Sequence, residues 1–583
     1  MKSLLYLNKF FYKYKTRFIL GIVITIVAQI FALYTPKLIS SSLKEIEDFI
    51  ETKTVNQEII YSTLLENILL IIATTIVSGF LTFLMRQTLI VMSRYVEFDL
   101  KNEIYAHYQT LSQSFFKQNR TGDLMNRITE DVAKVRMYVG PAIMYTINTF
   151  IRFVIVIVYM TNVSPKLTLY SLLPLPLLSY LIFKISTDIN KKSTLFQENL
   201  SKLSSFSQEV FSGIRIIKNY ALSPIFKEKF NLIAEDSKQK NIDLASTNAY
   251  FGPMMILLIG ISNLLVIYTG GVMYINHEIK IGIIIEFIIY INMLTWPVAS
   301  LGWVSSLVQE AAASQSRLNE FLKEKSEIIN YSDDKIEIKG KIKFEDVSFT
   351  YPETGIKALD HISFEIGAGK TLAILGNTGS GKSTILQLLF RMYALERGKI
   401  MIDDQAIESI NLYELRNQMS IVPQDGFLFS DTIEENIKFG KIDATQEEIE
   451  TVCKETHIHH NIITFKDGYQ TMLGERGITL SGGQKQRVSM ARALLKKSKI
   501  ILLDDCLSAV DTETEEIILS NLHQNITQKT AIIVSHRVSS VKNADEIIVL
   551  DEGKIIEKGT HNELISQEGR YYELYQKQLY EKK

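Results

Sequence analysis

The chain has 583 residues, too many for one hydrophobic core, so we expect at least two domains. Hydrophobic residues make up 46% and charged residues 22%, which a membrane half joined to a soluble half explains. The formal net charge of -1 gives no indication of the basic surface that a nucleic-acid-binding protein needs. The chain has two cysteines, Cys453 and Cys506, and because they lack ligand spacing we expect neither a disulfide framework nor a zinc site.

Six apolar segments occupy the first half of the chain, each close to the ~20 residues that span a bilayer. They lie at 18–39, 63–84, 141–161, 167–185, 251–275 and 281–301. Short turns join the third segment to the fourth and the fifth to the sixth, whereas the connections after the second and the fourth are long and polar. This grouping predicts short turns on one side of the membrane and long helical hairpins on the other.

The charges that flank the first segment give its orientation. Lysines and one arginine, with no acidic residue, precede it, and acidic residues outnumber lysines in the loop that follows. Because positively charged flanks stay in the cytoplasm, both termini are predicted to be cytoplasmic. The alternative, a soluble protein with six buried helices, explains neither the lengths nor the flanking charges.

Two ionisable residues, Arg152 and Glu286, lie inside the third and sixth segments, where charge is costly and often functional. We hypothesise that both line a translocation cavity and that Glu286 binds cationic cargo. The alternative is that they pair with each other or reach the membrane surface. In the predicted hairpins, 114–123 and 213–220 mix apolar and basic residues, as docking segments or ordinary helix packing would.

The composition becomes charged and loses its apolar runs over 316–340. We therefore predict a transmembrane domain with six helices and long cytoplasmic hairpins at 1–325. A linker at 326–340 and a soluble domain at 341–583 follow it.

A strand-like segment at 371–375 runs directly into a glycine-rich loop and then into a leucine-rich helix. This order predicts a phosphate-binding loop, in which backbone N–H groups close around phosphate oxygens. Lys382 is predicted to reach the terminal phosphates, and Ser383 to complete the coordination of Mg²⁺. The loop comprises Gly376, Asn377, Thr378, Gly379, Ser380, Gly381, Lys382, Ser383 and Thr384.

Polar residues follow three other predicted strands, where a doubly wound sheet places its ligands. Asp504 and Asp505 end the apolar strand at 500–503, and Asp504 is the predicted Mg²⁺ ligand. Gln424 is placed to touch Mg²⁺ or the attacking water, and His536 to contact a γ-phosphate. Tyr351, an aromatic at a strand end, is suited either to stacking on a nucleotide base or to packing at a sheet edge.

Ser481, Gly482, Gly483 and Gln484 open a helix. Small residues with free N–H groups at a helix start form an anion site. Because this segment lies far along the chain from the phosphate loop, it is suited to a nucleotide held by another subunit.

These motifs resemble those of the ABC exporter superfamily in its half-transporter form, and the resemblance covers essentially the whole chain. It implies an all-α six-helix transmembrane domain of the type I exporter fold, followed by an α/β P-loop domain with a helical subdomain. The matches are 376–384 to Walker A, 502–504 to Walker B, 480–484 to the LSGGQ signature, 508–511 to the D-loop, 471–477 to the loop before the signature, Gln424 to the Q-loop, His536 to the switch histidine and Tyr351 to the adenine-stacking aromatic.

The resemblance implies ATP and Mg²⁺ as cofactors and ATP hydrolysis coupled to transport across a bacterial plasma membrane. It implies a dimer that holds two ATP molecules between one subunit's Walker motifs and the other's signature. The segment around Gly213 is then expected to dock on the partner's ATPase domain. The expected partners are a second half-transporter, the lipid bilayer and a small amphipathic substrate, but no nucleic acid.

The chain departs from the family at Asp505, where the family places the glutamate that polarises the attacking water. Aspartate is one methylene shorter, which removes roughly 1.5 Å of reach, and a misplacement near 1 Å costs on the order of 100-fold in rate. This Walker site is therefore predicted to bind ATP and hydrolyse it slowly. The pattern resembles the degenerate-site subunit of heterodimeric bacterial multidrug exporters, whose partner supplies the catalytic glutamate. A homodimer in which Asp505 serves as the base is the alternative.

The function that the resemblance implies is ATP-driven efflux of amphipathic, drug-like compounds. The open alternatives are a homodimeric lipid or peptide exporter, a siderophore importer with the exporter fold, and an ATP-gated channel or sensor. A soluble ATPase acting on nucleic acid is opposed by the six apolar segments and the near-zero net charge.

Overall fold

The computed structural model describes residues 2–52, 57–474, 477, 480–507, 510, 512–526 and 529–581. The chain forms two units, each of which is treated by itself. One comprises Met1–Gln109 and Gly122–Glu324, and the other comprises Thr110–Thr121 and Lys325–Lys583.

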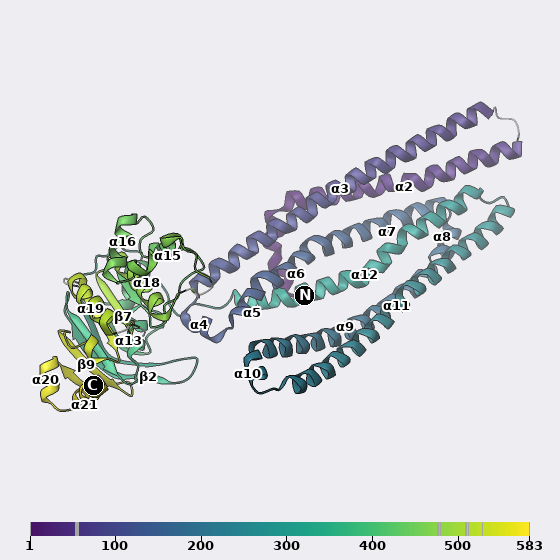
Figure 1. Ribbon diagram of the computed structural model, residues 1–583. Helices are drawn as coiled ribbons and strands as arrows, with labels where there is room; N and C mark the ends of the chain where they lie inside the picture. Colours follow the sequence, from purple (N-terminus) through teal and green to yellow (C-terminus); the bar gives the residue numbers. More distant parts are fainter. Residues whose placement is uncertain are drawn as a thin grey trace. The chain divides into compact units, whose positions relative to one another are not determined.

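The first unit is built from helices (Figure 1). Helix α12 packs against α2, α7 and α11, and α11 packs along α9. Its α-helices are α1 (Asn8–Lys13), α2 (Lys15–Thr52), α3 (Gln57–Thr110), α5 (Thr121–Asn126), α6 (Val132–Met137), α7 (Ile143–Val163), α8 (Pro165–Leu172), α9 (Leu175–Ser212), α10 (Ile214–Asn219), α11 (Ser223–Ile275) and α12 (Ile281–Phe321).

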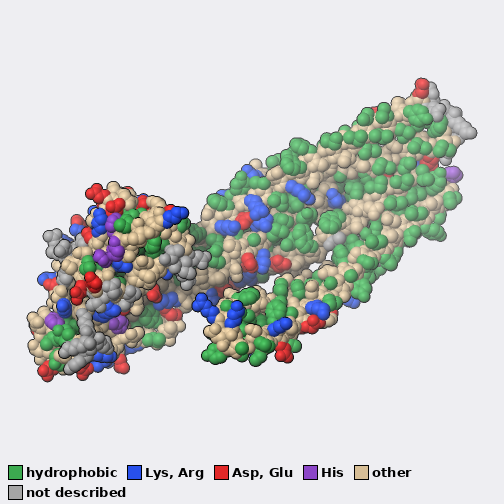
Figure 2. All heavy atoms as spheres, in the orientation of Figure 1, with side chains coloured by type: hydrophobic (Ala, Val, Ile, Leu, Met, Phe, Trp, Pro, Cys, Tyr) green, Lys and Arg blue, Asp and Glu red, His purple; other side chains and the backbone are tan. Residues whose placement is uncertain are grey.

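Five of the six predicted apolar segments lie inside single helical stretches that are long and apolar enough to cross a membrane. The fourth, 167–185, falls on α8 and α9, which are interrupted at Leu173 and Pro174. Proline has no N–H to donate and clashes with the preceding turn, so Pro174 and Pro176 explain the break. Figure 2 shows hydrophobic side chains over the long helices, which suits contact with lipid.

The second unit contains two sheets. An antiparallel sheet has the order β2-β1-β4-β5, and a six-stranded sheet has the order β10-β9-β3-β8-β7-β6, in which only β10 runs antiparallel to its neighbour. The strands are β1 (Ile342–Thr350), β2 (Lys357–Ile366), β3 (Thr371–Gly376), β4 (Arg397–Ile402), β5 (Gln405–Ala406), β6 (Met419–Val422), β7 (Ile500–Asp504), β8 (Thr530–Ser535), β9 (Glu546–Asp551) and β10 (Lys554–Gly559).

Helices surround these sheets, and those between β6 and β7 form a second hydrophobic cluster together with residues of β6, β7, β8 and α19. The short helix α4, from the segment Thr110–Thr121, also belongs to this unit. The helices are α4 (Gln113–Gln118), α13 (Lys382–Leu389), α14 (Leu412–Asn417), α15 (Ile433–Lys438), α16 (Gln446–Glu455), α17 (His459–Ile462), α18 (Gly482–Leu495), α19 (Thr512–Ile526), α20 (His561–Ser566) and α21 (Arg570–Glu581).

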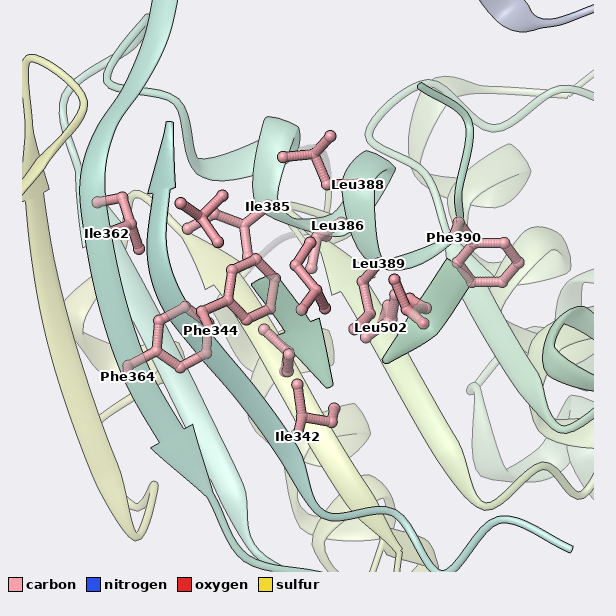
Figure 3. Packing of buried hydrophobic residues seen from close by; sticks show 14 of the residues in the cluster. Ile342, Phe344, Ile362, Phe364, Ile385, Leu386, Leu388, Leu389, Phe390 and Leu502 are labelled. Carbon is pink, nitrogen blue, oxygen red and sulfur yellow. The ribbon is translucent and has the colours of Figure 1, made fainter. Parts of the chain in front are cut away.

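The core that carries the phosphate loop lies between the two sheets and α13 (Figure 3). Phe344 of β1 and Phe364 of β2 stack with ring centroids 4.5 Å apart. Leu386 and Leu389 of α13 point into the same cluster and are fully buried, as is Leu502 of β7. Leu386 and Leu389, one turn apart on the same face of α13, thus fix this helix on the sheet whose strand β7 ends in Asp504.

Candidate nucleotide-binding site

The phosphate loop leaves β3, which lies between β8 and β9 at the centre of the parallel sheet, and ends in α13. Glycine is required at two of its positions because the main chain approaches other strands closely. A Cβ atom on Gly376 would lie 2.2 Å from the Leu550 carbonyl oxygen, and one on Gly381 would lie 2.2 Å from that of Ala358. Gly381 also has φ +98°, a left-handed conformation that side chains rarely adopt.

Lys382 folds back onto this loop. Its side chain is 6% exposed, and Nζ donates hydrogen bonds to the carbonyl oxygens of Gly376 (2.9 Å) and Asn377 (2.8 Å). Burial lowers the pKa of the Lys382 ammonium to about 8, although the nearby Asp504 and Asp505 carboxylates favour the charged form. A phosphate would give this poorly solvated cation a charged partner.

Ser380 is also suited to a phosphate ligand. Its side chain is 4% exposed, and its Oγ makes no hydrogen bond to any residue within the described ranges. A buried hydroxyl without a partner is costly, and a bound phosphate oxygen would satisfy it. Both the side chains and the backbone of the loop are therefore suited to binding the phosphates of a nucleotide.

The pKa of Lys382 predicts how ATP binding depends on pH. We expect the affinity for ATP to fall as the pH rises through about 8, because the ammonium that pairs with the phosphates is then lost. Bound phosphate raises the lysine pKa, so binding at about pH 9 is expected to take up a proton, and binding at about pH 7 is not. Isothermal titration calorimetry in two buffers with different ionisation enthalpies measures this uptake.

Lys496 offers a matched control for that measurement. It too donates hydrogen bonds to two carbonyl oxygens, those of Arg416 and Met419, and burial lowers its pKa. Lys496→Met is expected to leave proton uptake on ATP binding unchanged. Equal proton uptake at the two pH values in the wild-type chain would show that Lys382 is not the group that titrates.

Asp504 ends β7 beside the phosphate loop. Ser383 Oγ donates a hydrogen bond of 2.8 Å to Asp504 Oδ1, and burial raises the pKa of the Asp504 carboxyl. Two hard oxygen ligands close together, completed by phosphate and water, fit Mg²⁺, which rarely has an all-protein site. Among the described residues, no group of three or more His, Cys, Asp or Glu side chains could hold a metal ion.

Asp505 follows in a left-handed backbone conformation with φ +43°. It is 8% exposed, and its N–H donates a hydrogen bond of 2.9 Å to the Val534 carbonyl oxygen. Aspartate tolerates the left-handed conformation better than most residues, so the local backbone conformation favours aspartate at position 505.

The strand order brings the other polar residues to the same edge. The strands β3, β8, β7 and β6 are parallel neighbours, so their carboxyl ends lie at one edge of the sheet. Gly376 and Asp504 end β3 and β7, His536 follows β8, and Gln424 comes two residues after β6. His536 is half-buried, and Gln424 is exposed. The sequence prediction of a shared site at the carboxyl edge thus has the geometry it requires.

Tyr351 lies against the first turn of α13. Its hydroxyl is 2.9 Å from Thr384 Oγ1 and donates to Gln387 Oε1 at 3.2 Å. Lys117 of α4 lies over its ring, with Nζ 4.9 Å from the centroid, and also contacts Glu353 at 3.4 Å. Base stacking by Tyr351 stays a prediction. The contact from α4 falls in the segment 114–123, whose residues allowed either docking or ordinary helix packing.

The LSGGQ segment forms the start of α18. Ser481 Oγ accepts a hydrogen bond from the Gln484 N–H, and Gln484 Oε1 accepts one from the Ser481 N–H, which forms a capping box. Gly482 is exposed, and Gly483 is partly so. In the ranges that the structure describes, no hydrogen bond joins these four residues to the phosphate loop. A site completed by another subunit remains the prediction.

Two predicted motifs lie partly outside the described residues. These are the D-loop at 508–511, of which only Val510 is described, and the loop at 471–477, of which Glu475 and Arg476 are not described.

Sequence reasoning missed Gln578 of the C-terminal helix α21. Its side-chain Nε2 donates to the His536 carbonyl oxygen (2.7 Å), and its Oε1 accepts from the Val538 N–H (2.7 Å). One amide therefore holds the backbone at His536 and at Val538, two residues further along the chain. No local motif marks this residue, because only the fold brings α21 beside β8.

This amide clamp yields a second prediction. Gln578→Ala is expected to weaken ATP binding about fivefold, the loss of about one net hydrogen bond, and to leave ADP binding unchanged. The reason is that a misplaced His536 loses a contact that only the γ-phosphate offers. Fluorescent-nucleotide competition on the purified chain measures both affinities.

The neighbouring substitution Gln576→Ala, on the same helix, is the control and is expected to change neither affinity. In a His536→Ala background, Gln578→Ala should have no further effect. Equal losses of ATP and ADP affinity would mean that Gln578 supports the fold and does not position His536.

Comparisons with known proteins show which family has these features. The model of the ABC transporter transmembrane region matches residues 18–298, and the ABC transporter model matches 359–508. The multidrug resistance-like ATP-binding protein MdlA of Buchnera aphidicola subsp. Schizaphis graminum is 35% identical over 574 residues, which cover 98% of this chain and 97% of that protein. The probable multidrug resistance ABC transporter ATP-binding/permease protein YheI of Bacillus subtilis is 34% identical over 574 residues, 98% of this chain and 97% of that protein.

A solved structure of a bacterial Atm1-family ABC exporter with ATP bound superposes with a TM-score of 0.79. The superposition covers 97% of this chain and 98% of that one at 24% sequence identity, so the likeness concerns the fold.

Proposed function

The chain belongs to the ABC transporter family as a half-transporter, with the transmembrane region and the ATP-binding domain on one polypeptide, and from this premise we propose that it is one half of a heterodimeric drug exporter. The predicted fold class, a helical transmembrane domain followed by a P-loop domain, is confirmed. So is its activity as an ATP hydrolase coupled to transport, and exporters of this family act as dimers in the membrane.

The observation that carries the proposal is an aspartate at 505 beside an otherwise complete nucleotide site. Lys382, Ser383, Asp504 and His536 are all present around it. This subunit then binds ATP at its own Walker motifs but turns it over slowly. Its signature at 481–484 completes the competent site of a partner that carries glutamate.

The proposed roles are those that the motifs imply, and the hydrogen bonds of Lys382 and Ser383 support them. The backbone of the phosphate loop and Lys382 hold the phosphates, and Ser383 with Asp504 would hold Mg²⁺, which supplies charge neutralisation at the β- and γ-phosphates. Asp505 faces the attacking water, Gln424 would touch Mg²⁺ or that water, and His536 contacts the γ-phosphate. The base stacks on Tyr351, and Ser481, Gly483 and Gln484 face the partner's nucleotide. Closure of the two ATPase domains on ATP would open the transport path outward, and hydrolysis would reset it.

The cargo proposed is an amphipathic, drug-like compound, because two relatives are named as multidrug resistance proteins. The proposed setting is a bacterial plasma membrane with both termini in the cytoplasm, and the proposed domains are 1–325 and 341–583 with a linker at 326–340.

A homodimer is the second candidate, and the left-handed backbone at Asp505 favours it. In that conformation aspartate is common for reasons of local geometry, so its presence alone does not require a weak site.

Purification of the chain alone and together with an adjacent-gene half-transporter tests the proposal. Negligible ATPase activity alone, restored by the second chain, is the expected result. ATP-driven accumulation of an amphipathic dye in sealed inverted vesicles then separates a pump from a channel. Robust turnover by the chain alone would overturn the heterodimer.

A further inference from the structure

A cavity of about 340 Å³ lies between α9, α11 and α12 in the first unit. Its volume falls within the range of small-molecule sites. It is lined by serine, asparagine and aromatic side chains, and both tryptophans of the chain, Trp296 and Trp303, are among them.

The tryptophans form one wall. Trp296, Ser300 and Trp303 are spaced i, i+4 and i+7 on α12, so they share one face of the helix. Trp296 is 64% exposed and Trp303 is 45% exposed, so both rings present accessible surface. Tyr145 of α7 holds the ring of Trp303 edge to face, with centroids 5.3 Å apart.

The other walls supply hydrogen-bonding groups. Ser186 and Asn190, one turn apart on α9, and Asn248 of α11 line the cavity beside Phe251. Each asparagine amide offers one acceptor and two N–H donors. Helix α9 approaches α12 closely at Gly302, where a Cβ atom would lie 2.4 Å from Ser186 Oγ.

The cavity lies deep along α12. At 1.5 Å per residue, Trp296 is roughly 22 Å and Trp303 roughly 33 Å from the start of α12 at Ile281. For a hydrocarbon core ~30 Å thick that begins at the start of α12, the two rings lie on either side of its far boundary. A compound that partitions into the membrane would meet the cavity at that depth.

Among the described residues, none with a charged side chain lines this cavity. The two ionisable residues noted in the sequence are bonded elsewhere: Arg152 Nε donates to Gln29 Oε1 (2.9 Å), and the buried Glu286 accepts from the Tyr290 hydroxyl (2.8 Å). A cation would therefore lose its hydration here without gaining a carboxylate partner. Cation–π contact with the tryptophan rings offsets only part of that desolvation free energy. The lining favours a neutral ligand.

We propose that this cavity binds neutral, planar aromatic compounds, which stack on Trp296 and Trp303 and hydrogen-bond to Asn190 and Asn248. The inference rests on the proposed function only in taking the ligand to be the cargo. It replaces the hypothesis that Glu286 selects cationic cargo with a site that carries no charge.

Because these are the only tryptophans in the chain, intrinsic fluorescence reports on the cavity directly. The full-length chain in nanodiscs is titrated with quinoline-3-carboxamide and with its N-methylated cation, which has the same ring system. Saturable quenching is expected with the neutral compound, at an affinity about tenfold higher than with the cation. Trp296→Phe and Trp303→Phe each leave one reporter and should each retain saturable quenching.

Asn190→Leu and Asn248→Leu are expected to weaken binding several-fold. Asn292→Leu is the matched control, because Asn292 is on α12 outside the cavity and its amide donates to the Ile288 carbonyl oxygen. It should leave the affinity unchanged.

Equal affinities for the two compounds would overturn the proposal. Quenching that does not saturate, like that of free N-acetyltryptophanamide, would also overturn it. Such quenching is expected if the tryptophans only anchor α12 at the membrane surface. Saturable binding of the neutral compound without ATP-driven transport would instead overturn the proposed function and leave the site standing.

Discussion

In the pairs that the chain forms with itself when purified alone, Asp505→Glu is expected to raise the ATPase turnover by about 100-fold. The added methylene restores roughly 1.5 Å of reach toward the attacking water. The main chain cannot supply that reach, because the Asp505 N–H is bonded to Val534 in the neighbouring strand β8. Side-chain length therefore decides whether the carboxylate reaches the water.

Two controls separate this effect from a general change at the sheet edge. Asp505→Asn, which has no base, should stay as slow as the wild-type chain or slower. Asp551→Glu lengthens a carboxylate at the end of β9 in the same sheet and should leave turnover unchanged. Fast turnover by the wild-type chain alone, with no gain in Asp505→Glu, would mean that Asp505 is a working base and that the chain forms a homodimer.

Lys382→Ala is expected to weaken ATP binding by about 100-fold, or about 2.7 kcal/mol, because the phosphates lose a partly desolvated cation. The nucleotide-free chain is not expected to become less stable. The buried ammonium is an unfavourable group when no phosphate is present, as its lowered pKa indicates.

Thermal unfolding with and without ATP measures both effects, since a ligand stabilises the folded state in proportion to its occupancy. The wild-type melting temperature should rise with ATP, and that of Lys382→Ala should not. Lys370→Ala removes an exposed lysine that pairs with Asp545, and it should keep the ATP-dependent rise. A variant that melts well below the nucleotide-free wild type would show that Lys382 mainly holds the loop together.

The sequence by itself determined the membrane spans and the nucleotide motifs, because both are local. A run of ~20 apolar residues suffices to mark a span, and a strand, a glycine-rich loop and a helix in succession suffice to mark a phosphate loop. The interrupted fourth span was within reach as well, since Pro174 and Pro176 are visible in the sequence.

The tertiary structure decided what depends on contacts between distant segments. The order of β3, β8, β7 and β6 places His536, Asp504 and Gln424 at one edge, and α21 brings Gln578 to the His536 segment. Packing also decided that Arg152 and Glu286 bond to neighbours while uncharged residues line the cavity. The physical reason is that hydropathy and spacing fix which face of a helix or strand is apolar, whereas the neighbour that a polar side chain meets depends on how all the elements pack.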